Sequence, residues 1–165
     1  MKSNKIPIRY LPLRLTKKDK QIQLNMLKKS RKLYKKGKYY TRKQVTSYTS
    51  KPSKHIITAR KIYKVDTISP NKSLARATGC SINALNKIVQ KGEGAYYSSG
   101  SRPNQTAQSW GLARLASSIT GGKAAAVDFN ILEKGCKHNK KAFLLAKKSK
   151  RKYGFGHSKT KRIII

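Results

Sequence analysis

Lysine and arginine side chains gather closely enough in this sequence to act together, and the chemistry open to them is the binding of negative charge. The 165 residues include 40 Lys and Arg against five Asp and Glu, which gives a formal net charge of +35. Because so much like charge repels itself, we expect a polyanionic or acidic partner. Cations of this kind bind phosphates by releasing counterions, so the affinity falls with salt and does not depend on base sequence.

Two runs of the chain hold dense groups of cations, and we predict that they contact this partner. The first cation cluster consists of Lys28, Lys29, Arg31, Lys32, Lys35, Lys36 and Lys38. The second cation cluster consists of Lys147, Lys148, Lys150, Arg151 and Lys152. Neither run contains an acidic residue.

Tyrosines are interleaved with the cations of both basic ends, and they have two interpretations. They are Tyr34, Tyr39, Tyr40, Tyr48, Tyr63 and Tyr153. Such rings can stack on unpaired bases. The alternative, which we favour, is that they pack between helices and neighbouring proteins. No element that would read base edges is recognisable.

The remaining functional residue types are too few or too scattered for catalysis. The five carboxylates show no paired spacing, and the three histidines lie in basic contexts typical of surface residues. The Gly-Gly-Lys at 121–123 fails as a phosphate loop, because Ser117 stands where the first glycine should be and Ala124 where magnesium needs Ser or Thr. We predict no enzyme, no cofactor, no metal and no small-molecule substrate.

The cysteine content and the hydropathy indicate a cytosolic setting. Cys80 and Cys136 belong to no metal-binding pattern. Since the sequence shows no secretory signal, we expect both to be reduced thiols rather than a disulfide. No apolar run approaches the roughly 18 residues of a membrane-spanning helix, so we expect no transmembrane segment.

Charge divides the chain into three zones that must position these residues. Residues 1–65 form a basic N-terminal arm with two helical segments, and residues 137–165 form a basic C-terminal tail. Residues 66–136 are nearly neutral and are expected to fold as a compact helical module. The predicted fold is therefore mainly α, a small helical module flanked by extended or helical cationic arms.

Caps, glycine stops and apolar spacing predict seven helical segments. They span 16–37 with Thr16 as cap, 53–63 with Pro52 in the first turn, 69–79 with Ser69 as cap, 81–94 with Ser81 as cap, a helix that Asn104 or Thr106 caps and Gly121-Gly122 end, 128–133, and one or two turns at 142–146. The predicted core consists of Leu85, Val89, Trp110, Leu112, Leu115, Ile119 and Leu132. No β-branched alternation is sustained, so a sheet is not expected. The closing isoleucines 163–165 have two interpretations, a frayed end or an anchor that docks in a partner or adds to its sheet.

Two blocks of the sequence carry a resemblance to a known family. They are "YYTRKQVTSYTSKPSKHIITARKIYKV" and "SRPNQTAQSWGLARLASSITGGKAAAVDFNILEKGC". With R-P-N-Q-T, S-W, A-R-L-A-S and T-G-G-K-A in this order, the chain from "RYLPLRLTKKDK" to Cys136 resembles an uncharacterised family of small basic proteins of nucleocytoplasmic large DNA viruses, including the chlorella viruses. The resemblance implies a viral origin and a place in the virion, and it brings no catalytic residue.

These observations together predict a structural virion protein. We expect a minor capsid component on the inner face of a large icosahedral shell, present in the host cytoplasm during assembly. Its arms would bridge neighbouring major and minor capsid proteins, and its charge would face those proteins, the anionic headgroups of an inner membrane, or viral DNA. The alternative is a DNA-binding protein that packages the genome without sequence specificity. A ribosomal-type RNA-binding protein is a third hypothesis.

Overall fold

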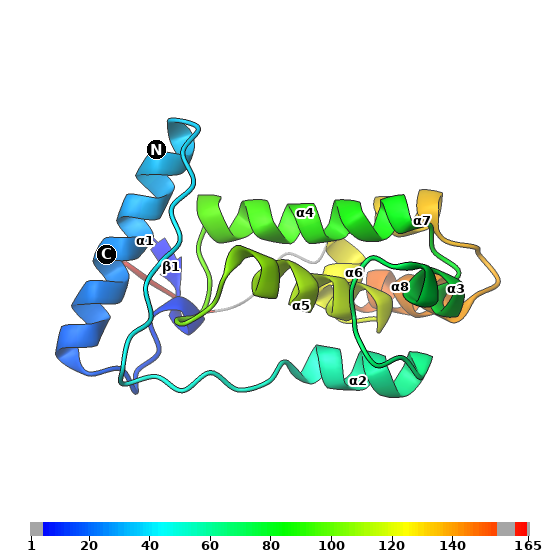
Figure 1. The fold of residues 1–165 in the computed structure, drawn as a ribbon, viewed down its shortest axis with the longest axis horizontal. Coiled ribbons are helices and arrows are strands. Elements are labelled where there is room, and N and C mark those ends of the chain that lie inside the picture. The colour runs from blue at the N-terminus through cyan, green and yellow to red at the C-terminus, as the bar shows by residue number, and fades with distance from the viewer. Residues whose placement is uncertain (1–4, 155–160, 165) are drawn as a thin grey trace. The chain divides into compact units, whose positions relative to one another are not determined.

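The computed structural model describes residues 5–154 and 161–164, and these residues are mainly helical, as predicted. The α-helices are α1 (Lys17–Lys35), α2 (Lys54–Tyr63), α3 (Lys72–Thr78), α4 (Ile82–Ser98), α5 (Ala107–Ile119), α6 (Lys123–Val127), α7 (Phe129–Gly135) and α8 (Lys141–Tyr153) (Figure 1). A 3-10 turn spans Ile8–Tyr10, and two short strands, β1 (Lys5–Pro7) and β2 (Arg162–Ile164), complete the described elements.

The chain forms two compact units that do not follow the three charge zones. Unit 1 combines residues 1–51, 94–107 and 158–165, and unit 2 combines residues 52–93 and 108–157. The segment 94–107 belongs to the nearly neutral zone by composition and to unit 1 by packing.

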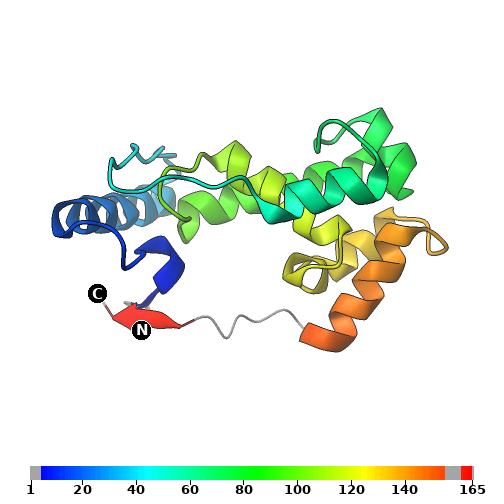
Figure 2. The same cartoon turned by 90° about the horizontal axis from the view of Figure 1, so that it is seen from below.

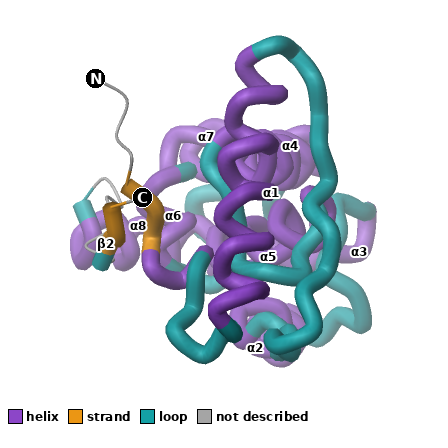
Figure 3. Tube along the Cα trace, turned by 90° about the vertical axis from the view of Figure 1, so that its left-hand side faces the viewer, coloured by secondary structure: helices purple, strands orange, loops and turns teal. Residues whose placement is uncertain are grey.

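Helix α1 organises unit 1, and local sequence signals set its ends. The Asp19 N–H donates to Thr16 Oγ1 at 3.2 Å, so Thr16 caps the helix as predicted. The chain leaves the helix through Gly37, whose φ of 74° favours glycine. The segment that follows runs back along the helix (Figures 1 and 3) and buries Val45 and Tyr48 against Met26.

A two-stranded antiparallel sheet joins the sequence-distant ends of unit 1 (Figure 2). Ile6 pairs with Ile163, and Lys5 pairs with Ile164. The expectation that no sheet forms is therefore wrong, because strands of three residues are too short to show a period of two. Of the closing isoleucines, Ile163 and Ile164 form a sheet with this chain's own β1 and not with a partner's sheet. Ile165 lies outside the described residues.

Unit 2 is built on a helical core to which helices α2 to α8 contribute. Leu85, Leu115, Ile119 and Leu132 are fully buried, and Val89 is 7% exposed. Trp110 and Leu112 are half-buried, so they lie at the edge of the protein interior and not inside it as predicted. The apolar spacing correctly predicts that Leu115 and Ile119 of α5 are buried. The predicted apolar stripe extends one turn too far toward the start of the helix.

Helices α4 and α5 lie side by side in unit 2 and touch through two glycines (Figure 1). A Cβ atom on Gly92 would lie 2.6 Å from the Gly111 Cα, and a Cβ on Gly111 would lie 2.6 Å from the Val89 carbonyl oxygen. No side chain fits at either position. The two backbones approach this closely because both residues are glycine.

Cys80 and Cys136 form a disulfide in unit 2, and the expectation of two free thiols is wrong. The cysteines face each other in an isolated antiparallel bridge. Hydrogen bonds from Ser81 N–H to Gly135 O and from Lys137 N–H to Gly79 O flank the pair, which is the arrangement that brings opposite side chains closest. The bridge ties the start of α4 to the end of α7.

Several predicted helix ends differ from the structure. Asn71, not Ser69, caps α3, because its Oδ1 accepts from the Leu74 N–H at 2.8 Å. Pro52 precedes the cap of α2 instead of lying in its first turn. Helix α4 continues to Ser98 past the predicted end at 94, α8 reaches 13 residues, and α6 was not predicted.

Candidate polyanion-binding surfaces

The first cation cluster lies along the second half of α1 and the turn after it. Its six lysines are exposed. Met26, Leu27 and Ser30 are buried on the opposite side of the helix. Arg31 is the exception: it is half-buried, and its Nε donates to the Ser99 carbonyl oxygen at 2.8 Å. The helix therefore presents lysines outward and uses its arginine for packing within unit 1.

Unit 1 has almost no acidic side chain to neutralise this cluster. Its three segments contain 21 Lys and Arg and a single acid, Asp19. Asp19 is 7% exposed, and its Oδ2 accepts from the Ser47 N–H at 2.8 Å. Hydrogen bonds from Ser47 lower the pKa of this carboxyl group. The one carboxylate of the unit is thus engaged at the start of α1, away from the lysines at its end.

The predicted tyrosines differ in exposure, and Tyr153 at the end of α8 is half-buried. Tyr48 and Tyr63 are buried, in agreement with packing, and the Tyr63 hydroxyl donates to the Ile119 carbonyl oxygen within unit 2. Tyr34 and Tyr39 are exposed beside the first cation cluster. Tyr40 is half-buried, with Lys29 Nζ 4.5 Å from its ring centroid. Packing within a unit therefore accounts for Tyr48 and Tyr63, and base stacking stays a prediction for the exposed rings.

A buried arginine supports this part of unit 1, and sequence reasoning missed it. Arg42 is 6% exposed, and its guanidinium donates to Ser30 Oγ at 2.9 Å, to the Tyr96 carbonyl oxygen at 2.9 Å and to Ser101 Oγ at 2.8 Å. Its Cζ lies 3.8 Å from the centroid of the Tyr96 ring. Burial lowers the pKa of Arg42, and the Tyr96 phenol opposes this shift. In a sequence with 40 cations, nothing distinguishes this arginine from its neighbours.

The second cation cluster lies on the outer face of α8 in unit 2. All five of its members are exposed, and Lys150 Nζ lies 4.2 Å from the Phe129 ring centroid. The opposite face buries Ala142, Phe143, Ala146 and Ser149. Ser149 Oγ donates to the Gly122 carbonyl oxygen at 2.7 Å. This cluster is therefore a regular amphipathic helix face without an exposed aromatic group of the kind found in unit 1.

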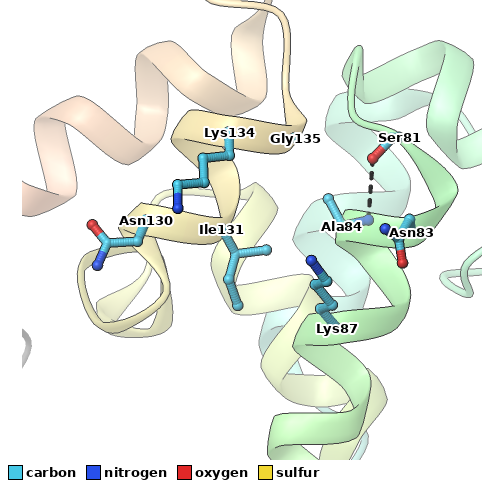
Figure 4. A pocket seen from close by; sticks show the side chains of 8 residues that line it. All are labelled: Ser81, Asn83, Ala84, Lys87, Asn130, Ile131, Lys134 and Gly135. Atoms are coloured by element: carbon cyan, nitrogen blue, oxygen red, sulfur yellow. Dashed lines mark hydrogen bonds between the residues drawn. The ribbon is translucent and has the colours of Figure 1, made fainter.

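Unit 2 also has a pocket of about 290 Å³ between the start of α4 and α7 (Figure 4). Lys87 extends from α4 toward the space between the two helices, Lys134 lies along α7 on the other wall, and none of the described lining residues is acidic. Asn83 and Asn130 add amide groups. The pocket therefore has a basic and polar lining. It was not predicted, because its two lysines are far apart in the nearly neutral zone.

Asp128 of unit 2 is neutralised by basic side chains, whereas Asp19 of unit 1 accepts hydrogen bonds. Asp128 is buried and forms a bidentate ion pair with Arg114, and Lys91 lies 3.5 Å away. Arg114 thus has a carboxylate partner inside its own unit.

Among residues 5–154 and 161–164, no three His, Cys, Asp or Glu side chains gather as a metal site would require. Within the same residues, no helix is both long enough and apolar enough to cross a bilayer.

Comparison with known proteins places most of the chain in one group. Residues 7–136 match the family described as "Family of unknown function (DUF5824)". The matched span includes the first cation cluster, the exposed tyrosines and the pocket, and it ends before α8. No curated protein and no solved structure matches the chain.

Proposed function

The chain belongs to the DUF5824 family, and we propose that it binds nucleic acid without sequence specificity through its first cation cluster. The observation that carries the proposal is the exposure of six lysines in a unit whose one acidic side chain is buried and hydrogen-bonded elsewhere. Phosphates supply the counter-charge that the unit lacks. The role is non-enzymatic, because the site offers cations and aromatic rings and no paired acid, base or nucleophile.

We propose further that this binding serves genome packaging in a virion. The support for the viral setting is the sequence resemblance, and the support for packaging is a cation surface with no device for reading bases. The inner face of a capsid is a location where such a surface meets DNA. Host cytoplasm is the compartment in which the protein would meet its partners during assembly.

A minor capsid role is the second candidate, and exposed apolar side chains favour it. Leu13 is 77% exposed and Ile164 is 79% exposed, although both are large aliphatic residues. Among the described residues, β2 pairs with β1 alone, so a strand of a neighbouring capsid protein can add to the other edge of β2. In this role the cation clusters contact acidic capsid proteins or inner-membrane headgroups.

Binding measured at several salt concentrations tests the first proposal. Fluorescence anisotropy with a labelled mixed-sequence DNA duplex should give a binding constant whose logarithm falls linearly with the logarithm of salt concentration. The variant Lys32→Gln/Lys35→Gln/Lys36→Gln/Lys38→Gln should bind more weakly. Its salt slope should be shallower by about 0.9 for each phosphate that the variant no longer neutralises. Glutamine preserves helix propensity, so the fold should not change.

The matched control places the same number of substitutions on α8, as Lys147→Gln/Lys148→Gln/Lys150→Gln/Lys152→Gln. Equal weakening by both variants would contradict the assignment to the first cluster. Absence of salt-dependent DNA binding by the unaltered protein would contradict the function itself. Polyglutamate or anionic vesicles competing better than DNA would favour the capsid role instead.

A further inference from the structure

Tyr39 combines two properties that seldom occur together, a highly exposed ring and a fixed position. Its side chain is 72% exposed. The ring centroid of Tyr39 lies 6.2 Å from that of Tyr34 and 5.0 Å from that of Tyr97. We name these three residues, from α1, the segment after it and α4, the tyrosine platform. All three belong to unit 1.

The platform is anchored in the interior of unit 1. Tyr97 packs edge-on against Tyr96, with an angle of 87° between the rings. Tyr96 is fully buried, and its ring covers the guanidinium of Arg42. The Tyr96 hydroxyl also accepts from the Arg42 N–H at 3.0 Å. A chain of ring contacts thus leads from a buried, hydrogen-bonded arginine to the exposed face of Tyr39.

This anchoring lowers the cost of binding a ligand. A freely rotating tyrosine loses side-chain entropy when a ligand immobilises it. The Tyr39 ring is already held by two neighbours, so less entropy remains to be lost. The planes of Tyr39 and its neighbours are inclined by 45° and 50°, and the rings are in contact. A flat group therefore stacks on the outer face of Tyr39 and does not insert between the rings.

We propose that the tyrosine platform stacks an unpaired base, so that the first cation cluster prefers single-stranded nucleic acid to duplex. The inference rests on the proposed function and narrows its substrate. Lys36 and Lys38 lie between Tyr34 and Tyr39 in sequence and are exposed, so their ammonium groups are available to the phosphates next to a stacked base. A duplex offers the same phosphates, but its bases are stacked on one another and present no free face.

The test compares the affinity of the protein for a fluorescein-labelled oligo-dT of 15 nucleotides with its affinity for a duplex of 15 base pairs, at one salt concentration. The unaltered protein should bind the single strand more tightly. Tyr39→Ala should weaken single-strand binding by about 5- to 150-fold, the range for loss of one base–aromatic stack, and should leave duplex binding unchanged. Tyr39→Phe keeps the ring and should retain the single-strand affinity. Tyr39→Leu keeps apolar volume without an aromatic face and should behave like Tyr39→Ala.

Thr41→Ala, at an exposed neighbouring position, is the matched control and should change neither affinity. Circular dichroism melting curves establish that each variant is folded. Equal weakening of single-strand and duplex binding by Tyr39→Ala would overturn the platform and leave the proposed function intact. Loss of binding by Tyr39→Phe would also overturn it, because the hydroxyl and not the ring would then be the contact. If neither oligonucleotide binds the unaltered protein, the proposed function fails as well.

Discussion

Arg114 and Asp128 form a bidentate ion pair inside unit 2. Arg114 Nε donates to Asp128 Oδ2 at 2.8 Å, and Arg114 Nη2 donates to Asp128 Oδ1 at 2.8 Å. Asp128 is 1% exposed. The pair links α5 to the turn that precedes α7, and the Ser118 hydroxyl adds a longer contact of 3.4 Å to the same carboxylate.

Removing one partner of this pair should destabilise unit 2 strongly. We expect Arg114→Met to lower the free energy of unfolding by about 3–5 kcal/mol, because it leaves a buried carboxylate with the more distant Lys91. Asp128→Asn should also destabilise the unit. The double variant should be destabilised by less than the sum of the two single effects, since no uncompensated charge remains when both are changed. Urea unfolding followed by circular dichroism measures the cycle, and additive effects would show that the two side chains are not coupled.

The glycine contact between α4 and α5 should tolerate no side chain. Gly111→Ala places a methyl group against the Val89 carbonyl oxygen, so we expect the free energy of unfolding to fall by about 1–3 kcal/mol from overpacking. Gly94→Ala is the matched control on α4, because no atom lies within 4 Å of its added Cβ. That variant should raise stability by up to about 1 kcal/mol through helix propensity. Thermal unfolding measures both, and equal effects in the same direction would contradict the close approach.

The disulfide should contribute a large part of the stability of unit 2. Cys80 and Cys136 are 56 positions apart. Closing a loop of that length corresponds to about 4 kcal/mol in the chain-entropy description. Cys80→Ser/Cys136→Ser should therefore unfold at a lower urea concentration than the unaltered protein. Reductant should lower the urea midpoint of the unaltered protein and leave that of the variant unchanged. Rapid alkylation of both cysteines in the native protein without reductant would contradict the bond.

Acid should weaken unit 1 through Asp19. The hydrogen bonds from Ser47 lower the pKa of this carboxyl group below its ordinary value of 3.8. Its stabilising contribution is therefore complete above about pH 4 and is lost as the pH falls through the lowered pKa. Asp19→Asn should be less stable at neutral pH, and the difference from the unaltered protein should shrink below pH 4. Glu133→Gln controls for the change in net charge, and a difference that stays constant with pH would contradict the assignment.

Local signals make the helices of this protein predictable. Thr16 and Ser81 are recognisable as caps because their hydroxyls act within three residues, and Gly79 is recognisable as a stop because its φ of 75° suits glycine. The same reasoning places most lysines of the first cation cluster on the outer face of the helix predicted at 16–37. The turns predicted at 142–146 end before the second cation cluster, which the structure places on the longer helix α8. The order of α1, α2, α4 and α5 follows from such short-range patterns.

Long-range pairing was not predictable from one sequence. Arg42 reaches Tyr96 across 54 positions, and Cys80 reaches Cys136 across 56. No local pattern marks either pair, because the partners meet only after the helices have packed. The exposed state of Tyr39 and the buried state of Tyr48 have the same origin: both follow α1 in similar sequence surroundings, and only the return of the chain along that helix separates them.

The pairing of β1 with β2 has a mechanical consequence. Lys5 and Ile164 are opposite each other at one end of the antiparallel pair, and Pro7 and Arg162 are opposite each other at the other end. A force that pulls residue 5 away from residue 164 therefore loads the hydrogen bonds one after another, as in opening a zipper, and not all together as in shear. Under tension applied at these two positions, the short sheet should open at low force, and the helices should bear load only afterwards.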